Sequence, residues 1–178
     1  MASGITVPGI TVPGAMAPGV TEVGFYHLTR TSPAAALPAL LGRTLAAGQR
    51  ALVRCGGEAQ VAALDEALWA SKDPNWLPHG TARTGKGPLQ PIWLTAGDDC
   101  PNGARYLFLL DGLAAADAGA FDRVFDLFDG QDPAAVAAAR GRWTAAKAAG
   151  LALAYWQQGE RGWIRGAASP SPSGRGPG

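Results

Sequence analysis

Residues 51–70 have the sequence ALVRCGGEAQVAALDEALWA. Its first part, Ala51–Cys55, is a short and mostly apolar run that predicts a buried strand, and the Gly56-Gly57 pair ends it. The part that follows, Glu58–Ala70, predicts an amphipathic helix, because its large apolar residues recur at helical spacing: Val61, Leu64 and Leu68. A buried strand joined by a short turn to such a helix is the unit from which α/β proteins are built.

The same alternation continues on both sides of this unit. Further strands are expected over Val23–Leu28, Ile92–Thr95, Tyr106–Leu110, Arg123–Phe128 and Leu151–Gln157. Further helices are expected over Pro33–Ala47, Pro133–Ala149 and, as a short one, Asp117–Asp122, with a long polar loop over Pro74–Pro91. This order predicts a three-layer, Rossmann-like α/β fold, with a largely parallel sheet and helices on both faces.

The two ends of the chain differ in composition from this core. Residues 1–20 contain the directly repeated pentapeptide Gly-Ile-Thr-Val-Pro, and residues 166–178 are rich in Gly, Ser and Pro. Both segments are expected to be disordered, which leaves one domain over residues 21–165. Met1, Met16 and Val20 are all possible translation starts.

Composition excludes several classes of protein. The 178 residues carry a net charge of +1, which argues against extensive binding to nucleic acid, so contact with DNA is expected to be indirect. No segment has the roughly 18 consecutive apolar residues of a membrane span, and no signal peptide is recognisable. With only two cysteines, Cys55 and Cys100, the chain is expected in the reducing cytoplasm.

A glycine-rich segment, Gly80–Gly87, resembles a P-loop except at its last position, where Gly87 replaces the Ser or Thr that binds magnesium. A P-loop also joins a strand to a helix, whereas this segment leads into prolines. A nucleotide-binding enzyme that uses Gly80–Gly87 is therefore the alternative hypothesis. The histidines and cysteines lack the spacing of a metal site, and no cofactor or metal is expected.

The helix expected over Pro133–Ala149 has an unusual stripe: Val136, Arg140, Trp143 and Lys147. Its opposite side consists of small residues that suit close packing on a sheet: Ala135, Ala138, Ala139, Ala145, Ala146 and Ala149. Two interpretations are equally supported by the residues. Either Trp143 is a core residue beside ordinary surface charges, or the stripe binds an acidic peptide with an apolar end.

A second aromatic cluster surrounds the polar loop: Trp69, Trp76 and Leu77. Semi-buried packing at the edge of the core is the favoured interpretation of the two indoles, because large aromatic residues usually fill such positions. If both indoles are exposed, they instead indicate a protein contact.

Four short motifs occur in an order that resembles the chi subunit of bacterial DNA polymerase III: Gly24–Leu28, Leu64–Trp69, Trp76–His79 and Arg140–Trp143. The resemblance covers about residues 22–163. It implies a Rossmann-like fold without a nucleotide site and a non-catalytic role in DNA replication. Members of that family bind the acidic, Phe-terminated tail of single-stranded DNA-binding protein and connect it to the clamp loader.

The resemblance also implies site residues. The tail-binding arginine and aromatic residue correspond to Arg140 and Trp143, with Arg142 beside them and Phe128 at the end of the preceding strand. Val136 stands where the family has a lysine, and Lys147 is expected to compensate for the missing charge. The surface that docks the psi subunit, or another clamp-loader subunit, corresponds to Trp69, Trp76 and Leu77.

Overall fold

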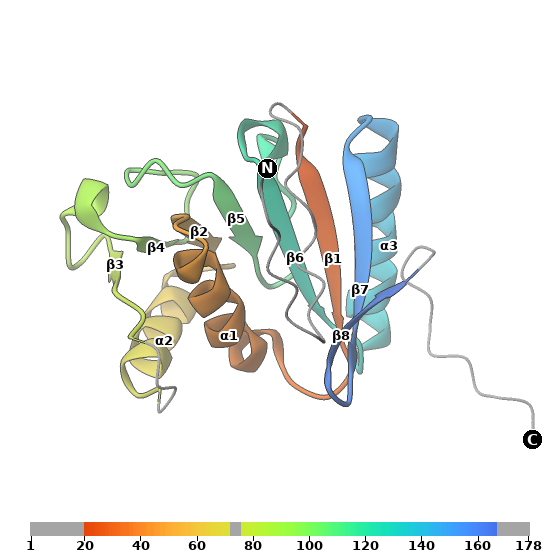
Figure 1. Cartoon of the computed structure of the whole chain (residues 1–178), viewed down its shortest axis with the longest axis horizontal. Coiled ribbons are helices and arrows are strands. Elements are labelled where there is room, and N and C mark those ends of the chain that lie inside the picture. Colours follow the sequence, from red (N-terminus) through yellow and green to blue (C-terminus); the bar gives the residue numbers. More distant parts are fainter. Residues whose placement is uncertain (1–19, 72–75, 167–178) are drawn as a thin grey trace, which may run out of the picture.

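The computed structural model describes residues 20–71 and 76–166, and among them eight strands form one sheet (Figure 1). The strands are β1 Glu22–Leu28, β2 Ala51–Arg54, β3 His79–Thr81, β4 Ile92–Thr95, β5 Tyr106–Leu109, β6 Arg123–Asp129, β7 Ala152–Gly159 and β8 Gly162–Gly166. Their order is β3-β4-β2-β5-β6-β1-β7-β8, and neighbours are parallel except for the antiparallel β7 and β8. The helices are α1 Pro33–Ala46, α2 Glu58–Trp69 and α3 Pro133–Ala148.

The sheet separates two apolar clusters, which confirms the predicted three-layer α/β fold. Successive residues of β1, such as Phe25 and Tyr26, belong to different clusters because side chains alternate across a strand. One cluster contains the buried leucines of α1 and α2, and the other contains Val136 and Ala139 of α3. In Figure 1, α1 accordingly lies in front of the sheet and α3 behind it.

Local signals explain where the helices begin and end. The Ser32 hydroxyl accepts a hydrogen bond of 3.2 Å from the Ala35 N–H at the start of α1, and Asp132 accepts one of 2.9 Å from Ala134 before α3. Gly48 and Gly150 follow α1 and α3 with φ of 72° and 74°, a left-handed conformation that favours glycine and ends a helix.

The elements between and after the main strands and helices differ in detail from the expected ones. The polar loop expected over Pro74–Pro91 contains β3 and a 3-10 helix over Gly87–Leu89. The short helix expected over Asp117–Asp122 is confirmed as a 3-10 helix over Ala118–Ala120. The sheet also has an additional edge strand, β8, which pairs with β7. Apart from Val20 and Gly166, the terminal segments expected to be disordered lie outside the described residues.

Candidate partner-binding surfaces

Helix α3 packs on the sheet with a side that coincides only in part with the predicted one. Val136 and Ala139 are buried, and Trp143 and Ala146 are partly buried against the same cluster. Three of the alanines expected to face the sheet are exposed: Ala138, Ala145 and Ala149. The larger apolar side chains face the sheet because they bury more apolar area there than alanines would.

Trp143 forms the border between the core and the surface. Its ring meets Phe25 of β1 edge to face, with centroids 5.1 Å apart and an interplanar angle of 63°. The indole is partly buried, so it presents only part of its surface outward. Val136 of the stripe is therefore buried, and Trp143 combines the two interpretations, because it packs against the core and keeps part of its surface accessible.

Arg142 is fixed within the fold. Its guanidinium donates hydrogen bonds of 2.6 and 2.8 Å to the two carboxylate oxygens of Asp126 in β6, and a longer one to the carbonyl of Gly112. Burial raises the pKa of Asp126, and the bonds from Arg142 oppose that rise. Arg142 is thus engaged by Asp126 rather than placed beside Arg140.

Arg140 lies next to a buried polar pair. The Nδ1 atom of His27 is 2.6 Å from the Tyr155 hydroxyl, and the His27 ring stacks on Phe128 at 5.0 Å. Burial lowers the pKa of His27; a backbone hydrogen bond at Gly130 opposes this, and the charge of Arg140 lowers the pKa further. Phe128 is itself buried beneath this pair, whereas Lys147 is exposed in the last turn of α3. The contact between Tyr155 and His27 was not predicted from the sequence, because β1 and β7 are far apart in the chain.

Trp69 and Trp76 form an exposed aromatic pair, so the favoured interpretation of semi-buried packing is wrong. Their exposed fractions are 57% and 70%, and their rings meet edge to face with centroids 5.5 Å apart. Leu77 points the other way and belongs to the core cluster of α1 and α2. An exposed pair of large aromatic side chains is typical of a protein-contact surface.

The Gly80–Gly87 segment contains the end of the edge strand β3 and the turn that follows it. The N–H groups of Thr84 and Gly85 both donate to the Thr81 carbonyl at 3.0 Å, and the Thr81 N–H donates to the Thr84 hydroxyl at 2.8 Å. A phosphate-binding loop needs such amides for its ligand. Here they are used within the turn, and a three-residue 3-10 helix follows. These features argue against the P-loop hypothesis.

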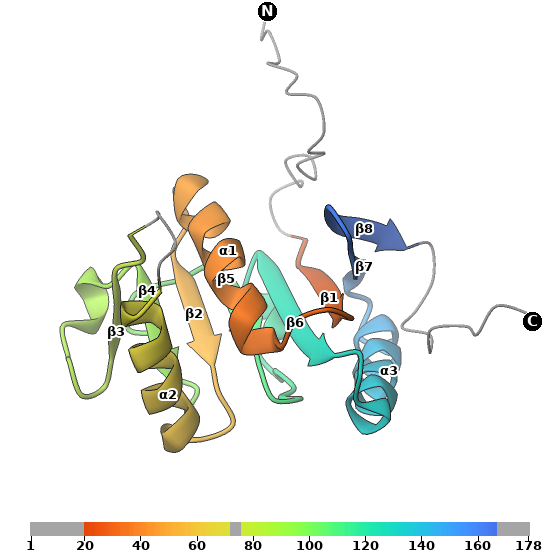
Figure 2. The same ribbon diagram turned by 90° about the horizontal axis from the view of Figure 1, so that it is seen from below.

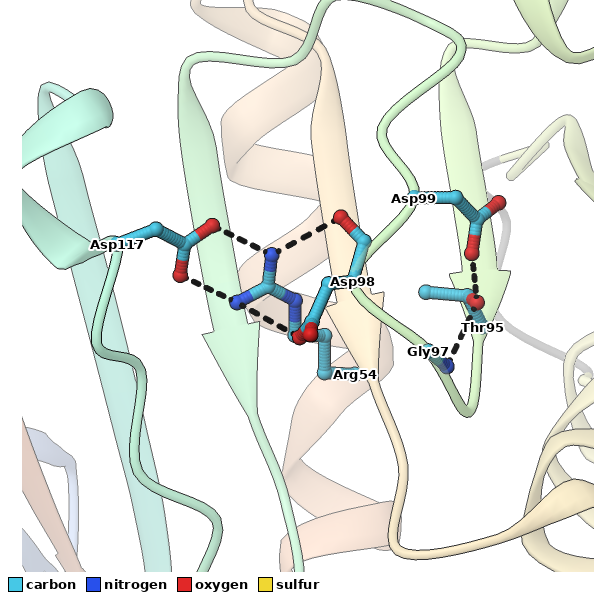
Figure 3. A network of polar contacts seen from close by, with 6 residues as sticks. All are labelled: Arg54, Thr95, Gly97, Asp98, Asp99 and Asp117. Atoms are coloured by element: carbon cyan, nitrogen blue, oxygen red, sulfur yellow. Dashed lines mark hydrogen bonds and ion pairs between the residues drawn. The ribbon is translucent and has the colours of Figure 1, made fainter.

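A polar network lies at the carboxyl ends of β2 and β4, where α/β folds often bind ligands (Figure 3). Arg54 donates two hydrogen bonds of 2.7 Å to Asp117 and a longer one to the Asp98 carbonyl. The bonds from Arg54 lower the pKa of Asp117. Nearby, the Thr95 hydroxyl donates to Asp99. These contacts hold the segments that contain Asp98 and Asp117, which connect β4 to β5 and β5 to β6, against the end of β2. The guanidinium of Arg54 is used in these contacts.

No group of three or more His, Cys, Asp or Glu side chains within residues 20–71 and 76–166 could hold a metal ion. Over the same ranges, none of the helices has the length and apolar character needed to cross a membrane.

Comparison with known proteins identifies the family. The model of the family described as DNA polymerase III chi subunit, HolC, matches residues 20–154, which include β1 to β6, α1 to α3 and the first part of β7. A comparison with individual curated proteins found no match. The family match covers well over half of the 178 residues. The chain therefore belongs to the family of the chi subunit of DNA polymerase III.

Proposed function

We propose that this chain is a non-catalytic accessory subunit that links single-stranded DNA-binding protein to the clamp loader of DNA polymerase III during replication. The observation that carries the proposal is the family match over residues 20–154. On this proposal the subunit contacts DNA only indirectly, which fits its net charge of +1, and it acts in the cytoplasm, where the chromosome is replicated.

The proposed tail-binding surface is the outer part of α3. Arg140, Trp143 and Lys147 follow one another at spacings of three and four residues, so they lie along one side of the helix. Arg140 and Lys147 would attract the carboxylates of an acidic tail, and the accessible edge of Trp143 would contact its terminal Phe. Lys147 is exposed, so its ion pair with the tail contributes little, and we expect modest affinity that falls with added salt.

The other three residues predicted for this site, Val136, Phe128 and Arg142, are held within the fold. Val136 is buried between α3 and the sheet, Phe128 is buried near the end of β6, and Arg142 is bound to Asp126. We assign them the role of holding α3 in place rather than of contacting the tail.

The second proposed surface is the Trp69–Trp76 pair, with Leu77 anchoring it in the core. Its proposed partner is the psi subunit or another clamp-loader subunit. An aromatic pair that is already exposed and in mutual contact offers the apolar centre that stable protein interfaces use.

The two surfaces are well separated, which is what a linking subunit requires. Helix α2 packs beside β3 and β4, and α3 packs beside β1, β6 and β7 (Figure 2). The two helices also lie on opposite faces of the sheet. One partner bound at α2 would therefore leave α3 accessible to the other.

The proposal is tested by measuring binding to full-length single-stranded DNA-binding protein and to a truncated form that lacks its acidic tail, using isothermal titration calorimetry. We expect binding to the full-length protein only, and equal binding to both forms would contradict the proposal. In a parallel pull-down from cell extract, Trp69→Ala should lose clamp-loader subunits that the wild type retains. Leu89→Ala is the control, because Leu89 is also exposed, at 73%, but lies outside the pair.

A further inference from the structure

A buried histidine lies beneath the exposed aromatic pair. His79 begins β3, and only 1% of its side chain is accessible. Its Nδ1 atom is 2.7 Å from the Leu77 carbonyl oxygen, and its ring centroid is 5.0 Å from that of Trp69. Its Nε2 atom is 3.2 Å from the Asp65 carboxylate, one helical turn before Trp69 on α2. His79 thus contacts both the helix that carries Trp69 and the segment that carries Trp76.

The chemistry of these contacts suits an imidazole. A carbonyl oxygen only accepts hydrogen bonds, so Nδ1 carries a proton and donates it to Leu77. Nε2 and the nearer oxygen of Asp65 are both buried and lack a hydrogen-bond partner among the described residues. They lie at the distance of an ion pair, which forms only when the ring is protonated on both nitrogens, and not in the direction of a hydrogen bond. An apolar side chain of similar size would fill the space but would leave the Leu77 carbonyl and Asp65 without these contacts.

We infer that His79 is a positioning residue that fixes Trp69 and Trp76 relative to each other before a partner arrives. The inference rests on the proposal that this pair is a docking surface. A surface that is already ordered loses less conformational freedom on binding, and a partner's apparent affinity falls in proportion to the fraction of molecules that hold the competent arrangement.

Two substitutions separate the contacts of His79. In His79→Asn the amide nitrogen takes the place of Nδ1, which keeps the bond to Leu77 but removes the contact with Asp65 and the ring beside Trp69. In His79→Gln the amide nitrogen takes the place of Nε2, which keeps the Asp65 contact but loses both the bond to Leu77 and the ring beside Trp69. The chain contains six tryptophans, so 5-fluorotryptophan labelling and 19F NMR give one resonance for each indole. Trp69→Phe and Trp76→Phe assign the two relevant lines.

We expect His79→Asn to shift the Trp69 resonance toward the position of free 5-fluorotryptophan, and His79→Gln to shift those of both Trp69 and Trp76. The line of Trp93, which is buried in the neighbouring strand β4, should stay in place and serves as the internal control. Six unchanged lines in both variants, or six lines that move together, would overturn the inference. This readout needs no partner, so it is independent of whether Trp69→Ala loses the clamp loader.

Discussion

Arg142 of α3 and Asp126 of β6 form a paired contact in which two N–H groups of one guanidinium bind both oxygens of one carboxylate, at 2.6 and 2.8 Å. Only 4% of the Asp126 side chain and 13% of that of Arg142 are accessible. The pair ties the helix that carries the proposed tail-binding surface to the centre of the sheet. It separates the role of Arg142 from that of Arg140, which lies two residues earlier.

Removing Arg142 should destabilise the protein strongly. Arg142→Ala leaves the Asp126 carboxylate buried without its partner, and breaking a buried pair in this way costs about 3–5 kcal/mol. We expect a loss of that size in the free energy of unfolding, measured with urea. Lys147→Ala on the same helix is the control and should change it by less than about 0.5 kcal/mol, since Lys147 is exposed. Similar values for the two variants would contradict the assignment.

Arg54→Ala should cost less than Arg142→Ala. Only 5% of the Arg54 side chain is accessible, but its partner Asp117 is 46% accessible and can be hydrated once the arginine is gone. We expect a loss of about 1.5–3 kcal/mol, the range for hydrogen bonds to charged groups. Asp98→Ala is the matched control, because that carboxylate is 96% accessible and only 3.8 Å from Arg54. An equal loss in both variants would show that the bonds to Asp117 are not the stabilising contact.

Two glycines should respond in opposite ways to alanine. A Cβ at Gly130 would lie 2.1 Å from the His27 ring and 2.7 Å from the Leu28 carbonyl oxygen, so Gly130→Ala must displace β1 or the turn before α3. A Cβ at Gly141, inside α3, meets nothing within 4 Å. We therefore expect Gly130→Ala to lower the melting temperature and Gly141→Ala to raise it. The rise reflects a gain of about 0.5–1 kcal/mol in the free energy of unfolding, because alanine favours a helix over glycine by that amount. The opposite order of melting temperatures would contradict the packing described around His27.

The stability of the protein should fall on mild acidification. Burial, opposed by the hydrogen bond at Gly130 and reinforced by Arg140, lowers the pKa of His27 below its ordinary value of 6.5. As the pH falls below about 6.5, the unfolded chain binds a proton that folded His27 does not yet accept, so protonation favours unfolding. We expect the free energy of unfolding, measured with urea between about pH 5 and pH 7, to change less steeply with pH in His27→Gln than in the wild type. Identical slopes would show that His27 does not contribute.

Local sequence signals were sufficient for most of the fold. The strand over Ile92–Thr95 was predicted with its observed bounds, and the capping residues Ser32 and Asp132 stand directly before the helices expected to begin at Pro33 and Pro133. These features depend on residues within one turn or one strand of each other. The uninterrupted apolar run beginning at Tyr106 likewise indicated a strand covered on both faces, and β5 is central in the sheet.

Features that depend on distant residues could not be predicted. Strand β3 contains only His, Gly and Thr, and it exists because β4 pairs with it. The orientation of α3 was misjudged because alanines suit both a buried and an exposed face, whereas Phe25 on the sheet provides the contact that draws Trp143 inward. Arg142 was placed beside Arg140 in the site because its partner, Asp126, is 16 residues away in the sequence.

The most direct test of the account compares Arg140→Ala with the wild type in a fluorescence-anisotropy titration of a short labelled peptide that has several aspartates and a C-terminal phenylalanine. Loss of charge-assisted hydrogen bonds worth about 1.5–3 kcal/mol should weaken binding roughly tenfold or more. Arg161→Ala removes the same charge from the exposed turn between β7 and β8 and should leave the curve unchanged. If the Arg140→Ala curve overlays that of the wild type, α3 is not the tail-binding surface.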